Sequence, residues 1–127
     1  MIKVFLVDDS PIVTSLVSGY LESRGFSIST FNSPFGVTNK LKIIKPHVIL
    51  MDLGLPGLRG DKLIDLCKKE KEACDCRIIL FSSSADQEMK DLVEKGIAND
   101  YFVKGGALKE LEGKIIAQAG ELLKETK

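Results

Sequence analysis

Residues 48–57 are VILMDLGLPG, an apolar run that ends in a carboxylate and passes directly into a segment rich in glycine and proline. The apolar run has the length and composition of a strand buried on both faces of a sheet. The glycines and the proline that follow exclude a helix immediately after this strand. The pattern therefore places the carboxylate of Asp52 at the exit of a buried strand.

Three other apolar runs end in the same way, in residues that can carry chemistry. Residues 4–7 are followed by Asp8 and Asp9, residues 78–81 by three serines that begin with Ser82, and residues 101–103 by Lys104. In an open parallel sheet the carboxyl ends of the strands lie along one edge, and such sheets bind their ligands outside that edge. We therefore expect these side chains to meet Asp52 in one site.

Short apolar runs alternate along the whole chain with longer amphipathic segments, which is typical of an α/β protein with a parallel sheet. The strands are predicted at residues 2–7, 27–31, 47–51, 77–82 and 99–103. The first, third and fourth are apolar enough for burial on both faces, whereas the second is polar and is expected at an edge. The fold class is therefore α/β, a single doubly wound (βα)5 domain with a five-stranded parallel sheet.

The helices are predicted from their caps and their apolar spacing. Ser10 as N-cap and Pro11 in the first turn predict the start of the first helix, and Gly25 predicts its end. The others are expected at about 34–44, from about 60, at 86–95 with Gly96 as its cap, and at 108–124. The residues expected to face the core are Ile12, Leu16, Val17, Leu21, Val37, Leu41, Ile44, Leu63, Ile64, Cys67 or Leu66, Met89, Leu92, Val93, Leu111, Ile115, Ile116, Ala119, Leu122 and Leu123.

Composition excludes several classes of function. The 127 residues are 44% hydrophobic and 28% charged, as in an ordinary globular domain, and 18 basic residues balance 18 acidic ones. The chain lacks a basic cluster, so direct nucleic-acid binding is not expected. It also lacks an apolar run of roughly 20 residues or a leader peptide, so we expect no membrane span and a cytoplasmic location. Three cysteines without zinc-ligand spacing are expected to be reduced thiols.

The residues at the strand ends favour phosphoryl transfer. Asp8, Asp9 and Asp52 are like charges that raise each other's pKa unless a cation neutralises them, and Mg²⁺ is the cation that suits such oxygen ligands. Lys104 can meet a phosphoryl oxygen, and Ser82 adds a hydroxyl donor. Positioning and charge neutralisation supply most of the catalysis at sites of this kind.

The chain resembles the receiver domain of two-component response regulators, including the chemotaxis regulators, over essentially its whole length. The motifs that carry the resemblance are Val7-Asp8-Asp9-Ser10, the segment 51–60, the strand Ile78-Ile79-Leu80-Phe81 with Ser82-Ser83, and Tyr101-Phe102-Val103-Lys104. The resemblance implies a flavodoxin-like fold with strand order 2-1-3-4-5, and one receiver domain over residues 1–127. It also implies a protein that catalyses only its own phosphorylation and dephosphorylation.

Carried over to this sequence, the resemblance implies a role for each site residue. Asp52 would be the phosphoacceptor, Asp9, Asp52 and the Gly54 carbonyl would bind Mg²⁺, and Asp8 would act through water. Ser82, Lys104 and the Ser83 N–H would contact the phosphoryl group, and Tyr101 would be the aromatic switch that follows Ser82.

The implied partners are proteins. A histidine kinase or a phosphotransfer protein would donate the phosphoryl group, since His47 is predicted at the opposite edge and is expected to be structural. The response would pass through the face formed by the fourth helix, fifth strand and fifth helix to a protein target or an output domain, with a phosphorylation-dependent dimer as a further expectation.

The chain departs from the family pattern next to Lys104, where Gly105-Gly106 replaces the usual proline. A cis peptide is costly without proline, so we expect a trans, more flexible loop and a less firmly placed lysine. Gly54 and Ser84, which lie two residues beyond Asp52 and Ser82, are small. They are expected to leave the phosphoryl group open to water and to allow fast self-dephosphorylation.

Two other functional classes also fit a carboxylate at a strand end. A phosphatase of the haloacid-dehalogenase kind uses such a nucleophile but normally has a second aspartate two residues later, where this chain has Gly54. A receiver-like scaffold would bind its partner without phosphorylation if the glycine pair had removed the contact of Lys104. Taken singly, Asp8 and Asp9 could cap a helix, Lys104 could be an exposed strand-end lysine, and Tyr101 could be a half-buried strand residue.

Overall fold

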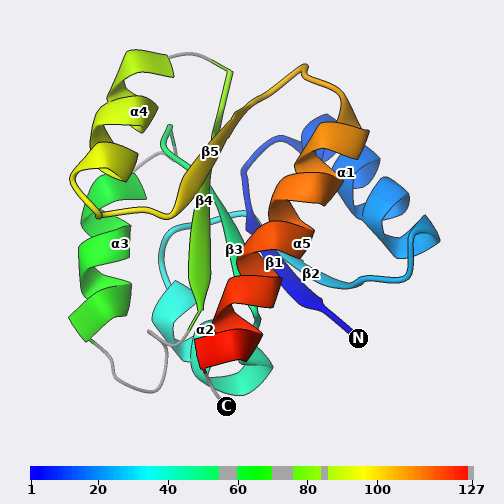
Figure 1. Ribbon diagram of the computed structural model, residues 1–127, viewed down its shortest axis with the longest axis horizontal. Helices are drawn as coiled ribbons and strands as arrows, with labels where there is room; N and C mark the ends of the chain where they lie inside the picture. The colour runs from blue at the N-terminus through cyan, green and yellow to red at the C-terminus, as the bar shows by residue number, and fades with distance from the viewer. Residues whose placement is uncertain (55–59, 70–75, 84–85, 126–127) are drawn as a thin grey trace.

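The computed structural model describes residues 1–54, 60–69, 76–83 and 86–125, and its strands form a single parallel sheet (Figure 1). The strands are β1 (Lys3–Val7), β2 (Ser27–Phe31), β3 (Val48–Asp52), β4 (Arg77–Ser82) and β5 (Asp100–Val103). Their order is β2-β1-β3-β4-β5, and every neighbouring pair is parallel. The predicted strand order and the edge position of the polar second strand are both confirmed.

Helices cover both faces of the sheet (Figure 1). They are α1 (Pro11–Ser23), α2 (Val37–Ile44), α3 (Gly60–Lys69), α4 (Asp86–Glu94) and α5 (Leu108–Glu125). On one face, α1 and α5 pack over alternate strand residues such as Val4 and Leu6. On the other face, α2, α3 and α4 pack over Phe5 and Val7. Because both faces are covered, the central strands are almost entirely apolar.

The caps predicted from the sequence are present. The Ser10 side chain accepts a hydrogen bond from the Val13 N–H at 3.4 Å, and Pro11 is the first residue of α1. Gly25 and Gly96, which follow α1 and α4, have φ of +92° and +76°. Because residues other than glycine avoid this left-handed region, both positions end their helices without strain.

Two predictions about α1 and one about α5 are wrong. Ile12 and Leu16 are 74% and 61% exposed, because α1 packs through Val17 and Leu21. Ile116 is 50% exposed, because the buried stripe of α5 repeats at every fourth residue. That stripe consists of Leu111, Ile115 and Ala119.

The start of α2 is also later than predicted. The helix begins at Val37, because Gly36 has a φ of +88° and cannot continue a right-handed helix toward residue 34. Val37, Leu41, Ile64, Met89 and Leu92 are buried as expected. Ile44 and Val93 are partly buried against the same core. The side chains of Leu63, Leu66, Cys67, Leu122 and Leu123 lie outside the described part of the structure.

His47 has the structural role predicted for it. Its Nδ1 accepts a hydrogen bond from the Lys3 N–H at 2.9 Å, which links the beginnings of β3 and β1 at the edge opposite Asp52. Burial, together with the charges of Lys3 and the N-terminus, lowers the pKa of His47 below 6.5. Among the described residues, Cys76 is not part of a disulfide, and no helix there is long and apolar enough to cross a membrane.

Candidate functional site

Four neighbouring strands bring polar residues to one edge of the sheet. Asp8 follows β1, Asp52 ends β3, Ser82 ends β4 and Lys104 follows β5. The pairing of Asp52 with Phe81, and of Ser82 with Val103, aligns these strand ends with one another. Parallel pairing thus converts residues that are far apart in the sequence into one site, as the sequence predicts.

Three carboxylates form a cluster at this edge. One carboxylate oxygen from each of Asp8, Asp9 and Asp52 lies within 4.8 Å of the others. Asp8 and Asp52 are only 1% and 5% exposed, whereas Asp9 is exposed.

Local backbone contacts hold the two buried carboxylates. The Ser10 N–H donates to Asp8 Oδ1 at 2.8 Å, and the Gly54 N–H donates to Asp52 Oδ1 at 2.9 Å. In each case the donor is two residues further along the chain, so a tight turn at the strand end fixes its own carboxylate.

Lys104 supplies a cation to the cluster. Its Nζ lies 2.6 Å from Asp8 Oδ2 and 3.3 Å from Asp52 Oδ2, and its backbone N–H donates to the Ser82 carbonyl at 2.9 Å. The described residues contain no cis peptide, so the prediction of a trans bond after Lys104 is confirmed. Both buried carboxylates contact the ammonium group of Lys104, so this lysine lies in the cluster although two glycines follow it. The expected flexibility of the loop remains a prediction.

Burial and charge shift the pKa values of this pair. Burial raises the pKa of Asp52, and the nearby Asp8 adds to this, while the Gly54 N–H and Lys104 oppose it. Burial also disfavours the charged form of Lys104, but the hydrogen bonds and charges of Asp8 and Asp52 outweigh it and raise its pKa. One ammonium group thus contacts two members of a cluster of three carboxylates, an arrangement that favours a further cation.

The remaining predicted residues lie around this cluster. Ser82 is 7% exposed, and Ser83 is exposed at the end of β4. Tyr101 is partly buried in β5, and the Nζ of Lys114 from α5 lies 5.4 Å from the centre of its ring. The roles predicted for these residues and for the Gly54 carbonyl remain predictions. Ser84 lies outside the described residues.

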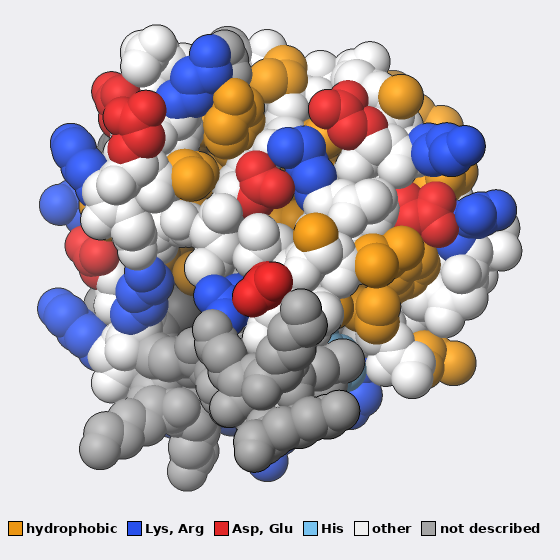
Figure 2. Space-filling model, viewed as in Figure 1, with side chains coloured by type: hydrophobic (Ala, Val, Ile, Leu, Met, Phe, Trp, Pro, Cys, Tyr) orange, Lys and Arg blue, Asp and Glu red, His pale blue; other side chains and the backbone are white. Residues whose placement is uncertain are grey.

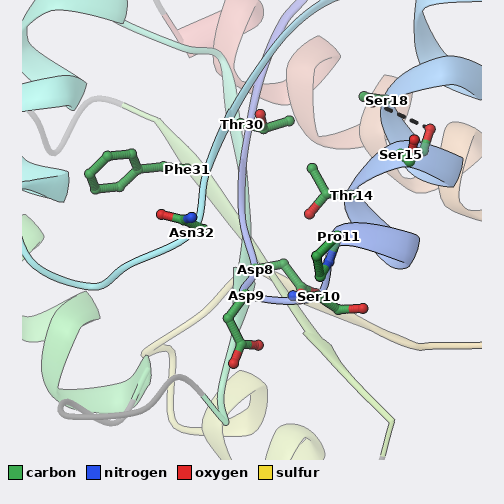
Figure 3. Close-up of a pocket in the computed structure, with 10 residues that line it drawn as sticks. All are labelled: Asp8, Asp9, Ser10, Pro11, Thr14, Ser15, Ser18, Thr30, Phe31 and Asn32. Atoms are coloured by element: carbon green, nitrogen blue, oxygen red, sulfur yellow. Dashed lines mark hydrogen bonds between the residues drawn. The ribbon is translucent and has the colours of Figure 1, made fainter.

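The sequence did not indicate the polar cavity beside the cluster (Figure 3). This cavity of about 510 Å³ lies between α1 and the end of β2. Its lining consists of Asp8, Asp9, Ser10, Pro11, Thr14, Ser15, Ser18, Thr30, Phe31 and Asn32. The spacing of Thr14, Ser15 and Ser18 along α1 is the one sequence signal for this polar wall.

A match to a protein-family model shows the family of the chain. The model of the response regulator receiver domain matches residues 4–116. The chain belongs to this family. In receiver domains, an acidic cluster such as that of Asp8, Asp9 and Asp52 is typical of a Mg²⁺ site.

Curated relatives of this receiver domain are longer proteins. It is 37% identical over 95 residues to a protein-glutamate methylesterase/protein-glutamine glutaminase of Clostridium acetobutylicum, covering 73% of this chain and 27% of that protein. It is 25% identical over 116 residues to the DNA-binding response regulator MtrA of Mycolicibacterium smegmatis, covering 91% of this chain and 50% of that protein. The chain therefore spans half or less of the length of these relatives.

Solved structures show the same fold. A CheY-like receiver domain from Methanospirillum hungatei superposes with a TM-score of 0.87 and 21% identity, covering 98% of both chains. The receiver domain of sensor histidine kinase PA1611 from Pseudomonas aeruginosa, which has a magnesium ion in its active-site cleft, superposes with a TM-score of 0.82 and 22% identity. This match covers 93% of this chain and 97% of that one.

Proposed function

We propose that this receiver domain is a phosphorylation-controlled switch in which Asp52 accepts a phosphoryl group from a histidine kinase or a phosphotransfer protein. The observation that carries the proposal is the ion pair between Lys104 and Asp52 inside the cluster with Asp8 and Asp9. A buried carboxylate at a strand end, next to a fixed ammonium group, has the surroundings needed to receive a phosphoryl group.

In the proposed reaction, a carboxylate oxygen of Asp52 attacks the phosphorus of a phosphohistidine. The P–O bond of an acyl phosphate forms while the P–N bond breaks, and the released imidazole takes up a proton. Carboxylates are established nucleophiles in covalent catalysis of this kind. Lys104 is expected to retain its contact with Asp8 and to exchange its contact with Asp52 for one with a phosphoryl oxygen.

The donor set fits Mg²⁺, because the carboxylate oxygens are close together and carry more charge than Lys104 balances. Asp9, Asp52 and the Gly54 carbonyl would hold the ion, with Asp8 acting through water. The ion would neutralise charge on the transferring phosphoryl group.

The output would follow from the new charge at Asp52. A phosphoryl group adds about 1.5 to 2 negative charges and several strong acceptors. Ser82 is expected to move toward it, Tyr101 to follow, and an alternative packing of the α4, β5 and α5 face to gain population. A protein target, an output domain or a second copy of the chain would bind that face.

The location and partners expected from the sequence remain predictions, namely a cytoplasmic protein that binds neither nucleic acid nor membrane directly.

Exposed Ile12 and Leu16 lie in the first turns of α1, directly after Asp8 and Asp9. We propose that these apolar side chains contact the phosphoryl donor, because that protein must approach the same edge of the sheet. We call these two residues the α1 apolar pair.

The alternatives are less well supported. A haloacid-dehalogenase phosphatase would need an acid where Gly54 donates its N–H to Asp52. The reason to expect a phosphorylation-independent scaffold is a Lys104 that the glycine pair has removed from the cluster. The contacts of Lys104 with both carboxylates remove that reason.

Incubation with Mg²⁺ and acetyl phosphate, followed by intact mass measurement, separates these functions. The switch predicts one phosphoryl adduct that disappears in Asp52→Asn. Turnover of phosphate esters without an adduct would indicate a phosphatase. A folded protein that forms no adduct would favour the scaffold.

A further inference from the structure

Two aromatic rings lie directly behind the candidate site. Phe81 of β4 and Phe102 of β5 are paired residues in the sheet, and both are almost fully buried. Their ring centres are 5.8 Å apart, and the ring planes differ by 16°, so the rings are stacked. We call these two residues the aromatic pair.

The aromatic pair contacts the cation of the site. Lys104 Nζ lies over the face of Phe81, 5.4 Å from the ring centre. A cation over an aromatic face is attracted by the ring quadrupole, and the attraction is strongest where water is excluded. Because the Lys104 side chain is only 15% exposed, its ammonium group is held between the Phe81 ring and the carboxylates of Asp8 and Asp52.

The glycine pair after Lys104 is coupled to this arrangement. A Cβ atom on Gly106 would lie 3.0 Å from Cζ of Phe102 and 3.2 Å from the Val103 carbonyl oxygen. The Phe102 ring therefore occupies the space that any side chain at position 106 would need. Gly105 has a φ of +93°, and the Gly106 N–H donates to the Val103 carbonyl, so the chain turns sharply back over Phe102.

We propose that Phe81 is a positioning residue for Lys104. In this proposal Phe102 supports the Phe81 ring by stacking on it, and Gly106 leaves the space that the Phe102 ring occupies. The inference rests on the proposed function of Lys104 in phosphoryl transfer. The contact with Phe81 would explain how Lys104 is held in place although two glycines, and not a proline, follow it. If the aromatic pair were only core packing, its replacement would lower stability without altering the position or the action of Lys104.

The first test compares Phe81→Leu with Phe26→Leu, a buried phenylalanine in the same core cluster. Proton–carbon NMR of lysine-labelled protein should show the Lys104 ε-methylene protons shifted upfield in wild type by the ring current, with the shift lost in Phe81→Leu and kept in Phe26→Leu. The rate of phosphorylation by acetyl phosphate should fall about threefold to tenfold in Phe81→Leu alone. Unchanged Lys104 signals and an unchanged rate in Phe81→Leu would overturn the proposal.

The second test preserves the shape of the ring. Mono-, di- and trifluorinated phenylalanine at position 81 weaken the ring quadrupole in steps while packing stays nearly constant. The phosphorylation rate should fall in the same order, whereas a rate that is independent of fluorination would contradict a cation–π role for Phe81.

The third test targets the glycine. Gly106→Ala should move Phe102 and reproduce the Lys104 NMR change, whereas Gly113→Ala, with open space at its Cβ, should not. If Gly106→Ala left the Lys104 signals unchanged, the part assigned to Phe102 and Gly106 would be wrong. Because the NMR readout does not require phosphorylation, absence of an adduct in wild type would refute the proposed function without deciding the inference.

Discussion

At the residue scale, the site is governed by the burial of Asp52. Burial and the neighbouring Asp8 raise its pKa above the ordinary value of 3.8, although Gly54 and Lys104 stabilise the charged form. The native state therefore retains the Asp52 proton at a pH where the unfolded chain has released it. Stability is consequently lost as the pH rises from below 3.8 through the raised pKa.

Replacement of Asp52 by its neutral isostere should therefore stabilise the metal-free protein. Asp52→Asn is expected to raise the melting temperature at pH 7 by a few degrees, because the variant buries no charge at this position. The difference should vanish below about pH 4 and decrease when Mg²⁺ is added. Thermal unfolding of both proteins from pH 3 to 8, with and without Mg²⁺, measures this difference in melting temperature. A less stable variant at pH 7 without metal would contradict the account.

Gly54 is predicted to set the lifetime of the phosphoryl group. A Cβ atom at this position would meet Asp52 Oδ1 at 3.5 Å, an ordinary contact, so a larger side chain fits and can shield the site from water. Gly54→Asn should slow the loss of phosphate severalfold, as followed by intact mass after removal of acetyl phosphate. A wild-type lifetime far longer than that of typical isolated receivers would contradict the predicted fast self-dephosphorylation.

At the scale of the elements, the start of β3 carries its own pH dependence. His47 Nδ1 accepts the Lys3 N–H only when that nitrogen is unprotonated, in agreement with the lowered pKa of His47. The unfolded chain binds a proton near pH 6.5 while the native state resists it. The stability contribution is therefore complete above that pH and is lost as the pH falls from there through the lowered native pKa of His47.

His47→Asn should remove this dependence, because the Asn Oδ1 can accept the same N–H and does not titrate. Chemical unfolding between pH 5 and 8 should show a smaller loss of stability at low pH in the variant than in wild type. Equal losses in the two proteins would show that His47 does not couple protonation to unfolding.

The α1 apolar pair gives a prediction about the phosphoryl donor. Ile12→Glu with Leu16→Glu should leave phosphorylation by acetyl phosphate unchanged, because neither side chain belongs to the core or the acidic cluster. Phosphotransfer from a cognate kinase should fall by about tenfold or more, as expected when central apolar contacts of an interface are lost. Lys69→Glu, at an exposed position of α3, is a control for added negative charge. A double variant that retained full phosphotransfer would contradict a role for this surface.

The elements also show what the sequence can predict. The ends of the strands were predictable, because a buried strand reads as an apolar run and the first charged residue after the run marks its carboxyl end. Asp8, Asp52 and Lys104 are such residues. The side of α1 that packs against the sheet could not be predicted from the sequence. Four residues in its first half are apolar, and only the packed structure shows which of them contact the sheet: Ile12, Val13, Leu16 and Val17. The contact of Phe81 with Lys104 was also hidden, because it depends on the register between β4 and β5.

At the scale of the whole molecule, the sheet gathers the chemistry at one edge and leaves the rest of the surface for partners. On the face shown in Figure 2, acidic, basic and apolar side chains are interspersed, in line with a net charge of zero. Among the described residues on this face, the basic side chains do not form an extended patch that could bind a polyanion. We therefore predict that the domain passes on its signal by binding a protein partner.

The central claim is that Asp52 carries the phosphoryl group, and borohydride reduction of the acyl phosphate tests it most directly. The protein is phosphorylated by acetyl phosphate with Mg²⁺ and reduced, and its peptides are mapped by mass spectrometry. Reduction converts a phosphorylated aspartate into homoserine, which the account predicts at position 52 and at no other position. Homoserine at Asp8 or Asp9 with Asp52 unmodified, or its absence from a folded protein, would contradict the account.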